Sequence, residues 1–248
     1  MGKSKIQWTE RTWNPVTGCT KYSDGCANCY AETMTRRLKA MGQEKYKDGF
    51  DKVACHPDAL DEPKNIIEPS MFFVCSMADL FHKDVSDEFI DKVLQVIKDC
   101  PQHTFQLLTK RTERMYEFFN FSNERHPVPA NCWIGTTVEN LFAVRRIPWL
   151  AEIKSAPVRF LSCEPLLSDL KDLDLFNIDW VIVGGESGNQ ARPMKKEWVL
   201  NIKRQCEEQG AAFFFKQWGT WGEDGVKRSK KANGSLLDGK EYKQMPKN

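Results

Sequence analysis

Residues 179–219 read DWVIVGGESGNQARPMKKEWVLNIKRQCEEQGAAFFFKQWG and contain one complete strand–helix–strand unit. The short, continuous apolar run Trp180 to Val183 predicts a buried strand, and the glycines Gly184 and Gly185 follow it. The segment Lys196 to Gln209 predicts a helix, and Ala212 to Phe215 predicts the next strand. Two strands joined through a helix normally pair in parallel with a right-handed crossover. This stretch therefore predicts an α/β fold.

The same pattern recurs along the rest of the chain, where short apolar runs end in polar residues and most are followed by helical segments. Strands are expected at residues 71–75, 104–108, 132–135 and 158–161, with a weaker one at 6–8; helices are expected at 26–41, 86–100 and 113–119. Six or seven such units predict a complete or partial (β/α) barrel of parallel strands. A doubly wound open sheet is the alternative, and both architectures place their ligands at the carboxyl ends of the strands.

The length of 248 residues predicts one large domain rather than two. We expect this barrel domain to cover residues 1–221, with an irregular insertion at 42–69. Residues 222–248 read as a polar, Gly- and Lys-rich tail that serves as a lid or closing flap.

Composition narrows the class of protein. The formal net charge is +2, which neither demands nor excludes a nucleic-acid partner. No run approaches the roughly 18 apolar residues of a membrane span, and the N-terminal residues lack the apolar core of a secretory signal. The sequence therefore predicts a cytoplasmic protein without membrane association. The nine cysteines are then expected to stay reduced rather than form a disulfide framework.

Three of those cysteines share one loop, with the spacing C-x6-C-x2-C: Cys19, Cys26 and Cys29. Pro15, Gly18 and Gly25 favour a loop conformation, and a helix is expected to start near the last cysteine. Three close thiolates suit a four-iron cluster that keeps one iron open for a ligand. Zinc with a distant fourth ligand is an alternative, since structural zinc normally takes four protein ligands. The third possibility is three unconnected thiols.

Polar residues at the strand ends are the other candidates for a site. Ser76 and Asp79 follow one strand, although Asp79 could equally cap a helix. Gly184 and Gly185 form a turn in which a backbone can approach a ligand closely, or a simple tight turn. Charged residues end several other strands and predict a mixed-charge site, with surface salt bridges as the alternative: Glu139, Glu164, Glu186, Lys110, Arg111 and Lys216. Cys163 is a candidate catalytic thiol, or else a small buried residue.

The cysteine loop resembles the cluster loop of radical S-adenosylmethionine enzymes. The whole chain resembles a family of uncharacterised phage and bacterial proteins, the phage "gene product 37/68" family, in stretches that run from residue 13 to residue 218: WNPVTGCTKYSDGCANCYAE, FFVCSMADLFH, FQLLTKRTERM, WIGTTVEN, VRFLSCEPLL, DWVIVGGESG, ARPM and FFFKQWG. The common spacing in radical enzymes is C-x3-C-x2-C, so the first gap is longer here.

This resemblance implies a radical-SAM-like barrel in which Cys19, Cys26 and Cys29 hold a [4Fe-4S] cluster and S-adenosyl-L-methionine binds the open iron. It implies cleavage of that cofactor to a 5′-deoxyadenosyl radical, an external electron donor and an unknown substrate, for which a nucleotide or a nucleic-acid base is the candidate. Cofactor-binding residues would be Ser76, Asp79, Glu139, Gly184, Gly185 and Glu186, and catalytic residues would be Glu164, Glu186, Lys216 and Cys163. The alternative function is a metal-stabilised nucleic-acid-binding or redox protein without radical catalysis.

Overall fold

The computed structural model describes residues 4–121 and 127–247, so the first and last residues of the expected domain and tail lie outside the described part. The chain divides into two compact units. Unit 1 comprises Met1–Tyr22, Cys29–Ile134 and Ile153–Pro157, and unit 2 comprises Ser23–Asn28, Gly135–Glu152 and Val158–Asn248. The division falls within strand β6 (Cys132–Thr137), and it separates Cys26 from the two other cysteines of the loop.

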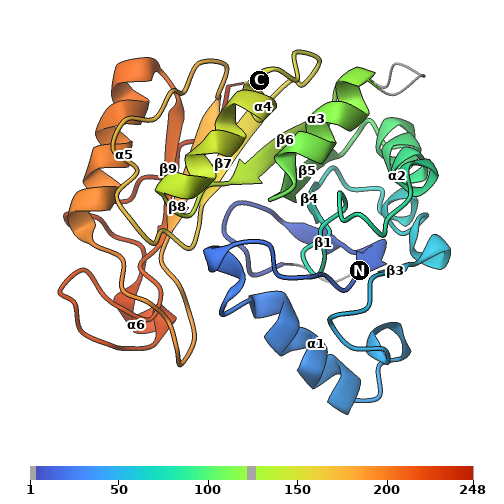
Figure 1. Ribbon diagram of the computed structural model, residues 1–248, viewed down its shortest axis with the longest axis horizontal. Coiled ribbons are helices and arrows are strands. Elements are labelled where there is room, and N and C mark those ends of the chain that lie inside the picture. Colours follow the sequence, from blue (N-terminus) through green and yellow to red (C-terminus); the bar gives the residue numbers. More distant parts are fainter. Residues whose placement is uncertain (1–3, 122–126, 248) are drawn as a thin grey trace. The chain divides into compact units, whose positions relative to one another are not determined.

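Unit 1 is built on three parallel strands, β1 (Arg11–Trp13), β4 (Met71–Val74) and β5 (Thr104–Thr109). Helix α2 (Asp87–Asp99) follows β4, and α3 (Thr112–Phe121) follows β5 (Figure 1). The Ser86 side chain caps α2 by accepting a hydrogen bond from the Phe89 amide at 3.4 Å. The apolar stripe of α2 is buried, as its helical period requires: Phe89, Ile90, Val93, Leu94, Val96 and Ile97.

The expected strand at residues 6–8 is wrong. Gln7 and Trp8 lie in a turn, closed by a hydrogen bond from the Thr9 amide to the Ile6 carbonyl at 3.4 Å. The first strand is β1 instead, and it pairs with β4 from Arg11 opposite Phe72 to Trp13 opposite Val74. Trp13 is the anchor of this strand, because it is fully buried and its indole donates to the Ala59 carbonyl at 2.8 Å.

Residues 42–69 contain three short 3-10 helices and the strand β3 (Ala54–Cys55), which pairs antiparallel with β2 (Val16–Thr17). Helix α1 (Tyr30–Ala40) precedes them and begins directly after Cys29, as expected. The 3-10 helices are η2 (Glu44–Tyr46), η3 (Pro57–Ala59) and η4 (Pro63–Asn65).

Unit 2 is built on the parallel strands β7 (Arg159–Cys163), β8 (Trp180–Gly184) and β9 (Ala212–Gln217). Every residue of β8 is buried, which explains its unbroken apolar sequence. Helix α5 (Lys196–Gln209) spans the predicted residues and ends at Gly210, whose φ of +79° suits glycine at a helix C-terminus. The other elements of this unit are η1 (Asp24–Cys26), η5 (Leu141–Arg146), α4 (Ile147–Ala151) and α6 (Lys230–Asn233).

The strand order in the sheet is β1-β4-β5-β6-β7-β8-β9, so each strand neighbours the next one along the chain except for the β2–β3 pair outside the sheet. The prediction of a complete or partial (β/α) barrel of about six to seven parallel strands is confirmed, and the sheet has seven strands. Within each unit, the strand ends that carry candidate residues therefore belong to the carboxyl edge of its parallel strands.

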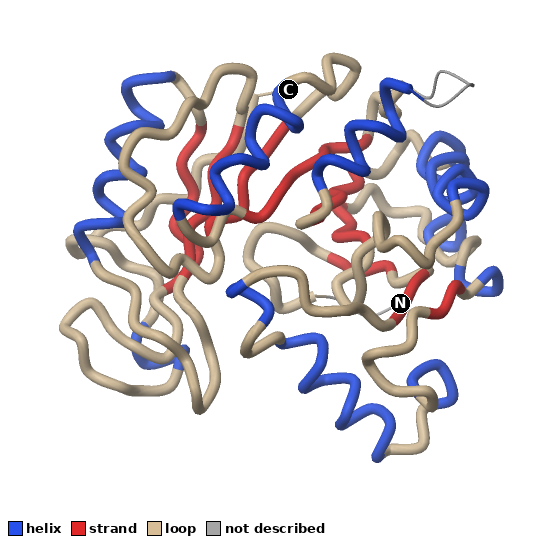
Figure 2. The backbone as a smooth tube through the Cα atoms, viewed as in Figure 1, coloured by secondary structure: helices blue, strands red, loops and turns tan. Residues whose placement is uncertain are grey.

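After β9 the chain is almost entirely loop apart from α6 (Figure 2). This segment returns along β9 in the antiparallel direction: the Phe215 amide donates to the Tyr242 carbonyl at 2.8 Å and the Gln244 amide to the Phe213 carbonyl at 3.2 Å. An antiparallel bridge joins Phe214 and Lys243. The end of this segment, 240–244, therefore covers the outer edge of β9.

Candidate functional site

Cys19, Cys26 and Cys29 are half-buried, whereas five of the six other cysteines are buried, Cys55 being the exception. None of the nine is in a disulfide among the residues that the structure describes. Within residues 4–121 and 127–247, no three His, Cys, Asp or Glu side chains come together as a metal-binding group. Cys19 and Cys29 belong to unit 1, and Cys26 belongs to unit 2.

Backbone contacts fix the position of Cys19. Its amide donates to the Phe50 carbonyl at 2.7 Å. Gly18 before it has φ +80°, and a Cβ there would lie 2.1 Å from the Lys52 carbonyl oxygen, so only glycine fits. Cys19 and Cys29 both pack against a small apolar cluster of Ala31, Phe50 and Met77. The start and the end of the cysteine loop are thus held on the same cluster.

Arg111 reaches Cys19 from the end of β5. Its Nη1 lies 3.8 Å from the Cys19 sulfur and 2.8 Å from Asp79 Oδ2, and its Nη2 donates to the Thr20 carbonyl and hydroxyl at 3.2 and 3.1 Å. Its guanidinium stacks over the Tyr22 ring at 5.0 Å. Burial lowers the pKa of Arg111, but the negative charges of Asp79 and Cys19 outweigh burial and leave that pKa above its usual value.

Asp79, a predicted cofactor-binding residue, is buried and accepts several hydrogen bonds within unit 1. Its donors besides Arg111 are the Thr109 hydroxyl at 2.7 Å, the Phe81 amide at 3.0 Å and the Lys110 amide at 3.4 Å. Ser76, the other predicted residue after β4, donates its hydroxyl to Asn14 Oδ1 at 3.1 Å. After β4, Ser76 therefore binds the chain segment before Cys19, and Asp79 binds Arg111, which contacts the Cys19 sulfur.

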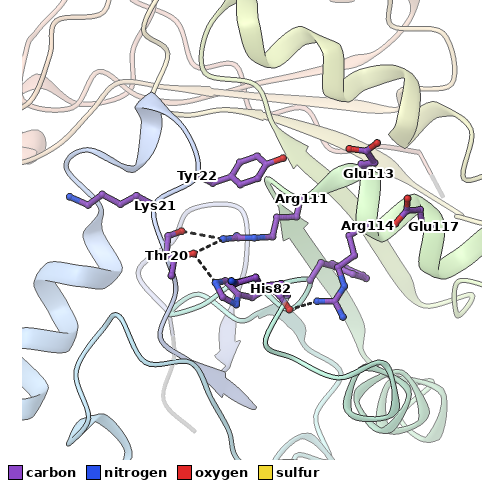
Figure 3. Close-up of a pocket in the computed structure, with 10 residues that line it drawn as sticks. Thr20, Lys21, Tyr22, His82, Arg111, Glu113, Arg114 and Glu117 are labelled. Atoms are coloured by element: carbon purple, nitrogen blue, oxygen red, sulfur yellow. Dashed lines mark hydrogen bonds between the residues drawn. The ribbon is translucent and has the colours of Figure 1, made fainter.

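A hollow of about 440 Å³ lies beside this network in unit 1 (Figure 3). Its walls are formed by the loop after Cys19, by the segment around His82, by Arg111 and by residues of α3 that include Arg114. His82 is fully buried, and its Nε2 lies 2.8 Å from the Thr20 hydroxyl. Burial, followed by the charge of Arg111, lowers the pKa of His82, so this ring is neutral at physiological pH.

The middle of the cysteine loop, residues 23–28, contacts two strand-end glutamates of unit 2. The Ser23 hydroxyl donates to Glu139 Oε1, and Glu139 Oε2 accepts from Arg146 Nη1 at 2.8 Å. The next residue, Asn140, donates to Asp24 Oδ2 at 2.9 Å while its own Oδ1 caps η5. Glu139 has no exposed surface, so it is a buried anchor of the loop segment.

Glu186 binds the other end of the same segment. Its Oε2 accepts from Asn28 Nδ2 at 3.1 Å and from the Arg192 amide at 2.8 Å, and Arg192 Nη2 donates to Oε1 at 2.6 Å. Arg192 Nη2 also donates to the Asp24 carbonyl at 3.1 Å. Burial raises the pKa of Glu186, but the hydrogen bonds from Arg192 and Asn28 outweigh it and lower the pKa below its ordinary value. Glu186 is therefore ionised and anchors Asn28.

The glycines before Glu186 let backbone and side chains approach the end of β8. A Cβ on Gly185 would lie 1.9 Å from the Trp218 carbonyl oxygen, and one on Gly184 would lie 2.9 Å from the Glu164 carboxyl carbon. The space beside Gly185 is thus filled by the chain's own segment after β9. The Thr220 amide completes this packing by donating to the Glu186 carbonyl at 2.9 Å.

Glu164 and Lys216, predicted catalytic residues, come together at the ends of β7 and β9. Lys216 Nζ lies 3.0 and 2.8 Å from the two Glu164 oxygens, and Gln217 Nε2 donates to Glu164 Oε1 at 3.1 Å. Their side chains are 20% and 13% exposed, so this pair is largely buried and keeps only a small contact with solvent. Cys163 differs, because it is fully buried within β7 and burial raises its pKa well above the usual value.

Several residues of this arrangement were missed by sequence reasoning: Ser23, Asn28, Arg146 and Arg192. Ser23 and Asn28 lie between the cysteines, and their positions inside the loop were the available signal. The arginines follow their glutamates by seven and six residues: Arg146 is the last residue of η5, and the segment from Glu186 to Arg192 contains no helix or strand. Nothing in the local pattern pairs them.

A protein-family model described as "Protein of unknown function (DUF5131)" matches residues 3–246. The chain belongs to this family. The description of the family gives neither an activity nor a phage origin, so the expected phage family name stays a prediction. No curated protein matches this member of the DUF5131 family.

Solved structures of spore photoproduct lyase are similar in fold to this DUF5131 member. The lyase complexed with dinucleoside spore photoproduct aligns with a TM-score of 0.48 and 12% identity, over 83% of this chain and 63% of that chain. A doubly substituted form with bound AdoMet and dinucleoside spore photoproduct aligns with a TM-score of 0.47 and 11% identity, over 84% and 64% of the two chains. The DUF5131 member thus spans less than two thirds of the length of these structures. In the described residues, no helix is both long and apolar enough to cross a membrane.

Proposed function

We propose that this protein is a radical S-adenosylmethionine enzyme whose [4Fe-4S] cluster is held by Cys19, Cys26 and Cys29. The observation that carries the proposal is that these three half-buried thiols share one short loop, which is held by acid–arginine pairs whose carboxylates are buried. When bound, the cluster and S-adenosyl-L-methionine would supply one-electron cleavage of the sulfonium and a 5′-deoxyadenosyl radical.

The donor set fits this group by its chemistry. Thiolate is the ligand of iron–sulfur clusters, and three ligands leave one iron open for the amino and carboxylate groups of the cofactor. All three cysteines are half-buried, whereas Cys163 is fully buried.

The strand-end residues then divide into two roles. Three of the acidic residues form ion pairs with arginines and accept further hydrogen bonds: Asp79, Glu139 and Glu186. We assign these residues to holding the cysteine loop. The Glu164–Lys216 pair at the ends of β7 and β9 is assigned to the substrate, because a carboxylate beside an ammonium can orient a polar group or move a proton. Ser76, Gly184 and Gly185 shape the surfaces around these residues.

The substrate, an external electron donor and a cytoplasmic location remain predictions from the sequence. A nucleotide or nucleic-acid base fits the polar Glu164–Lys216 pair, since base edges carry both donors and acceptors.

The test is anaerobic reconstitution with iron and sulfide, followed by iron analysis and by measurement of 5′-deoxyadenosine after adding S-adenosyl-L-methionine and dithionite. We expect the wild-type protein to take up iron and to form 5′-deoxyadenosine, and we expect Cys19→Ala, Cys26→Ala and Cys29→Ala each to lose iron. Cys55→Ala is the matched control, because Cys55 is equally half-buried and lies outside the loop. One bound zinc and no iron in the wild type would replace the proposal with the metal-stabilised, non-catalytic alternative.

A further inference from the structure

Arg111 lies beside Cys19 and contacts its sulfur. Its guanidinium makes one contact with sulfur and three with fixed groups: Nη1 lies 3.8 Å from Cys19 Sγ and 2.8 Å from Asp79, and Nη2 binds both Thr20 oxygens. A distance of 3.8 Å is within the range of an N–H···S hydrogen bond, and Arg is the strongest such donor because its charge is permanent.

The orientation of Arg111 is fixed from behind by Asp79. Asp79 Oδ1 accepts from the Thr109 hydroxyl at 2.7 Å and from the Phe81 amide at 3.0 Å, so the carboxylate cannot rotate without breaking both bonds. The same Thr109 hydroxyl accepts from the Arg111 amide at 2.9 Å. The donor fork of Arg111 is thus preorganised by residues at the ends of β4 and β5.

The loop on the other side of Arg111 is fixed as well. Tyr22 stacks on the guanidinium at 5.0 Å, and the Thr20 hydroxyl that binds Arg111 also binds His82 Nε2 at 2.8 Å (Figure 3). Residues 19–22 therefore contact Arg111 at their first, second and fourth positions. The side chains of Arg111 and Asp79 are only 12% and 9% exposed, so water screens this charge weakly.

We propose that Arg111 is a positioning residue that directs the Cys19 sulfur and raises the reduction potential of a cluster held there. This inference rests on the proposed function. Reduction adds negative charge to a cluster, and a fixed cation with an N–H···S bond stabilises the reduced form more than the oxidised form. The Asp79 charge partly offsets this effect, so the hydrogen bond and its direction are the main contribution.

The experiment uses the reconstituted holoprotein and reads iron content first and then the midpoint potential, by redox titration followed with electron paramagnetic resonance. Arg111→Met removes the positive charge and its N–H donors, but it leaves the buried Asp79 carboxylate without the Arg111 countercharge. The double variant Asp79→Asn/Arg111→Met removes both charges and so avoids this problem. We expect both to shift the potential to more negative values. Arg111→Lys keeps the charge without the planar fork and should shift it less. Lys21→Met is the matched control, because Lys21 lies in the same loop but pairs with Glu32 and is 58% exposed; it should leave the potential unchanged.

The outcomes separate the inference from the proposed function. A wild-type protein that takes up no iron refutes both. Full iron content with the same potential in wild type and in Asp79→Asn/Arg111→Met overturns the role of Arg111 and leaves the cluster proposal standing. Loss of iron from the double variant at an unchanged melting temperature supports the role, because the fold is then intact and Cys19 alone is misdirected.

Discussion

Replacing Arg146 by Met would remove one partner of the most buried ion pair described in unit 2. The two side chains are 6% and 0% exposed, and Arg146 Nη1 donates to Glu139 Oε2 at 2.8 Å and to the Thr137 carbonyl at 2.7 Å. In Arg146→Met, Glu139 keeps the Ser23 hydroxyl and the electrostatic interaction with Arg192 but loses the Arg146 guanidinium.

Breaking a buried pair from one side typically costs about 3–5 kcal/mol, because a charge is left without compensation. For a chain of this size that corresponds to a fall in melting temperature of roughly 6–20 °C. Glu139→Gln/Arg146→Met removes both charges and should recover most of that loss.

The assay is urea unfolding of the metal-free protein, followed by circular dichroism. Arg204→Met is the control: Arg204 pairs with Glu208 on the surface of α5, both side chains are more than half exposed, and such pairs contribute about 0.5 kcal/mol or less. This prediction would be refuted if Arg146→Met lowered the free energy of unfolding by less than about 1 kcal/mol, or by no more than Arg204→Met does.

Two further predictions concern the end of β8. Gly185→Ala should cost about 1–3 kcal/mol or more in the same urea assay, because a Cβ 1.9 Å from the Trp218 carbonyl oxygen forces the backbone apart; an unchanged unfolding midpoint would contradict this packing. Glu186 has a folded-state pKa below its ordinary value of about 4.3, so its stabilising contribution is present above that pH and is lost as the pH falls through the lower, folded-state pKa. The stability difference between wild type and Glu186→Gln should therefore shrink in acid, and a difference that is constant from neutral pH to about pH 3 would refute the assignment.

The elements of the fold follow closely from local sequence signals. The apolar run Trp180 to Val183 became β8, and Lys196 to Gln209 became α5 with Gly210 ending it. These signals are local, since strand burial and helix capping depend on a few consecutive side chains. Residues 6–8 failed as a strand because pairing with β4 is made by Arg11–Trp13, and no local feature encodes which of two neighbouring segments pairs.

The candidate site was predictable as a set of residue types but not as a set of contacts. Glu139 and Glu186 stood out because charged residues follow apolar strands, and that signal is the same for a ligand-binding side chain and for a structural anchor. Their partners Ser23 and Asn28 lie 116 and 158 residues away in sequence. Such contacts are decided by tertiary packing, which no periodicity in the sequence reports.

The antiparallel return of residues 240–244 along β9 has a consequence for the behaviour of the chain in concentrated solution. β9 is the last strand of the sheet, and a bare sheet edge is a template for pairing with another molecule. Here the Phe213 carbonyl and the Phe215 amide of that edge are already bonded to Gln244 and Tyr242. Protection of this edge thus depends on a few residues near the C-terminus, and their removal by a protease would expose the edge of β9 to pairing with another molecule.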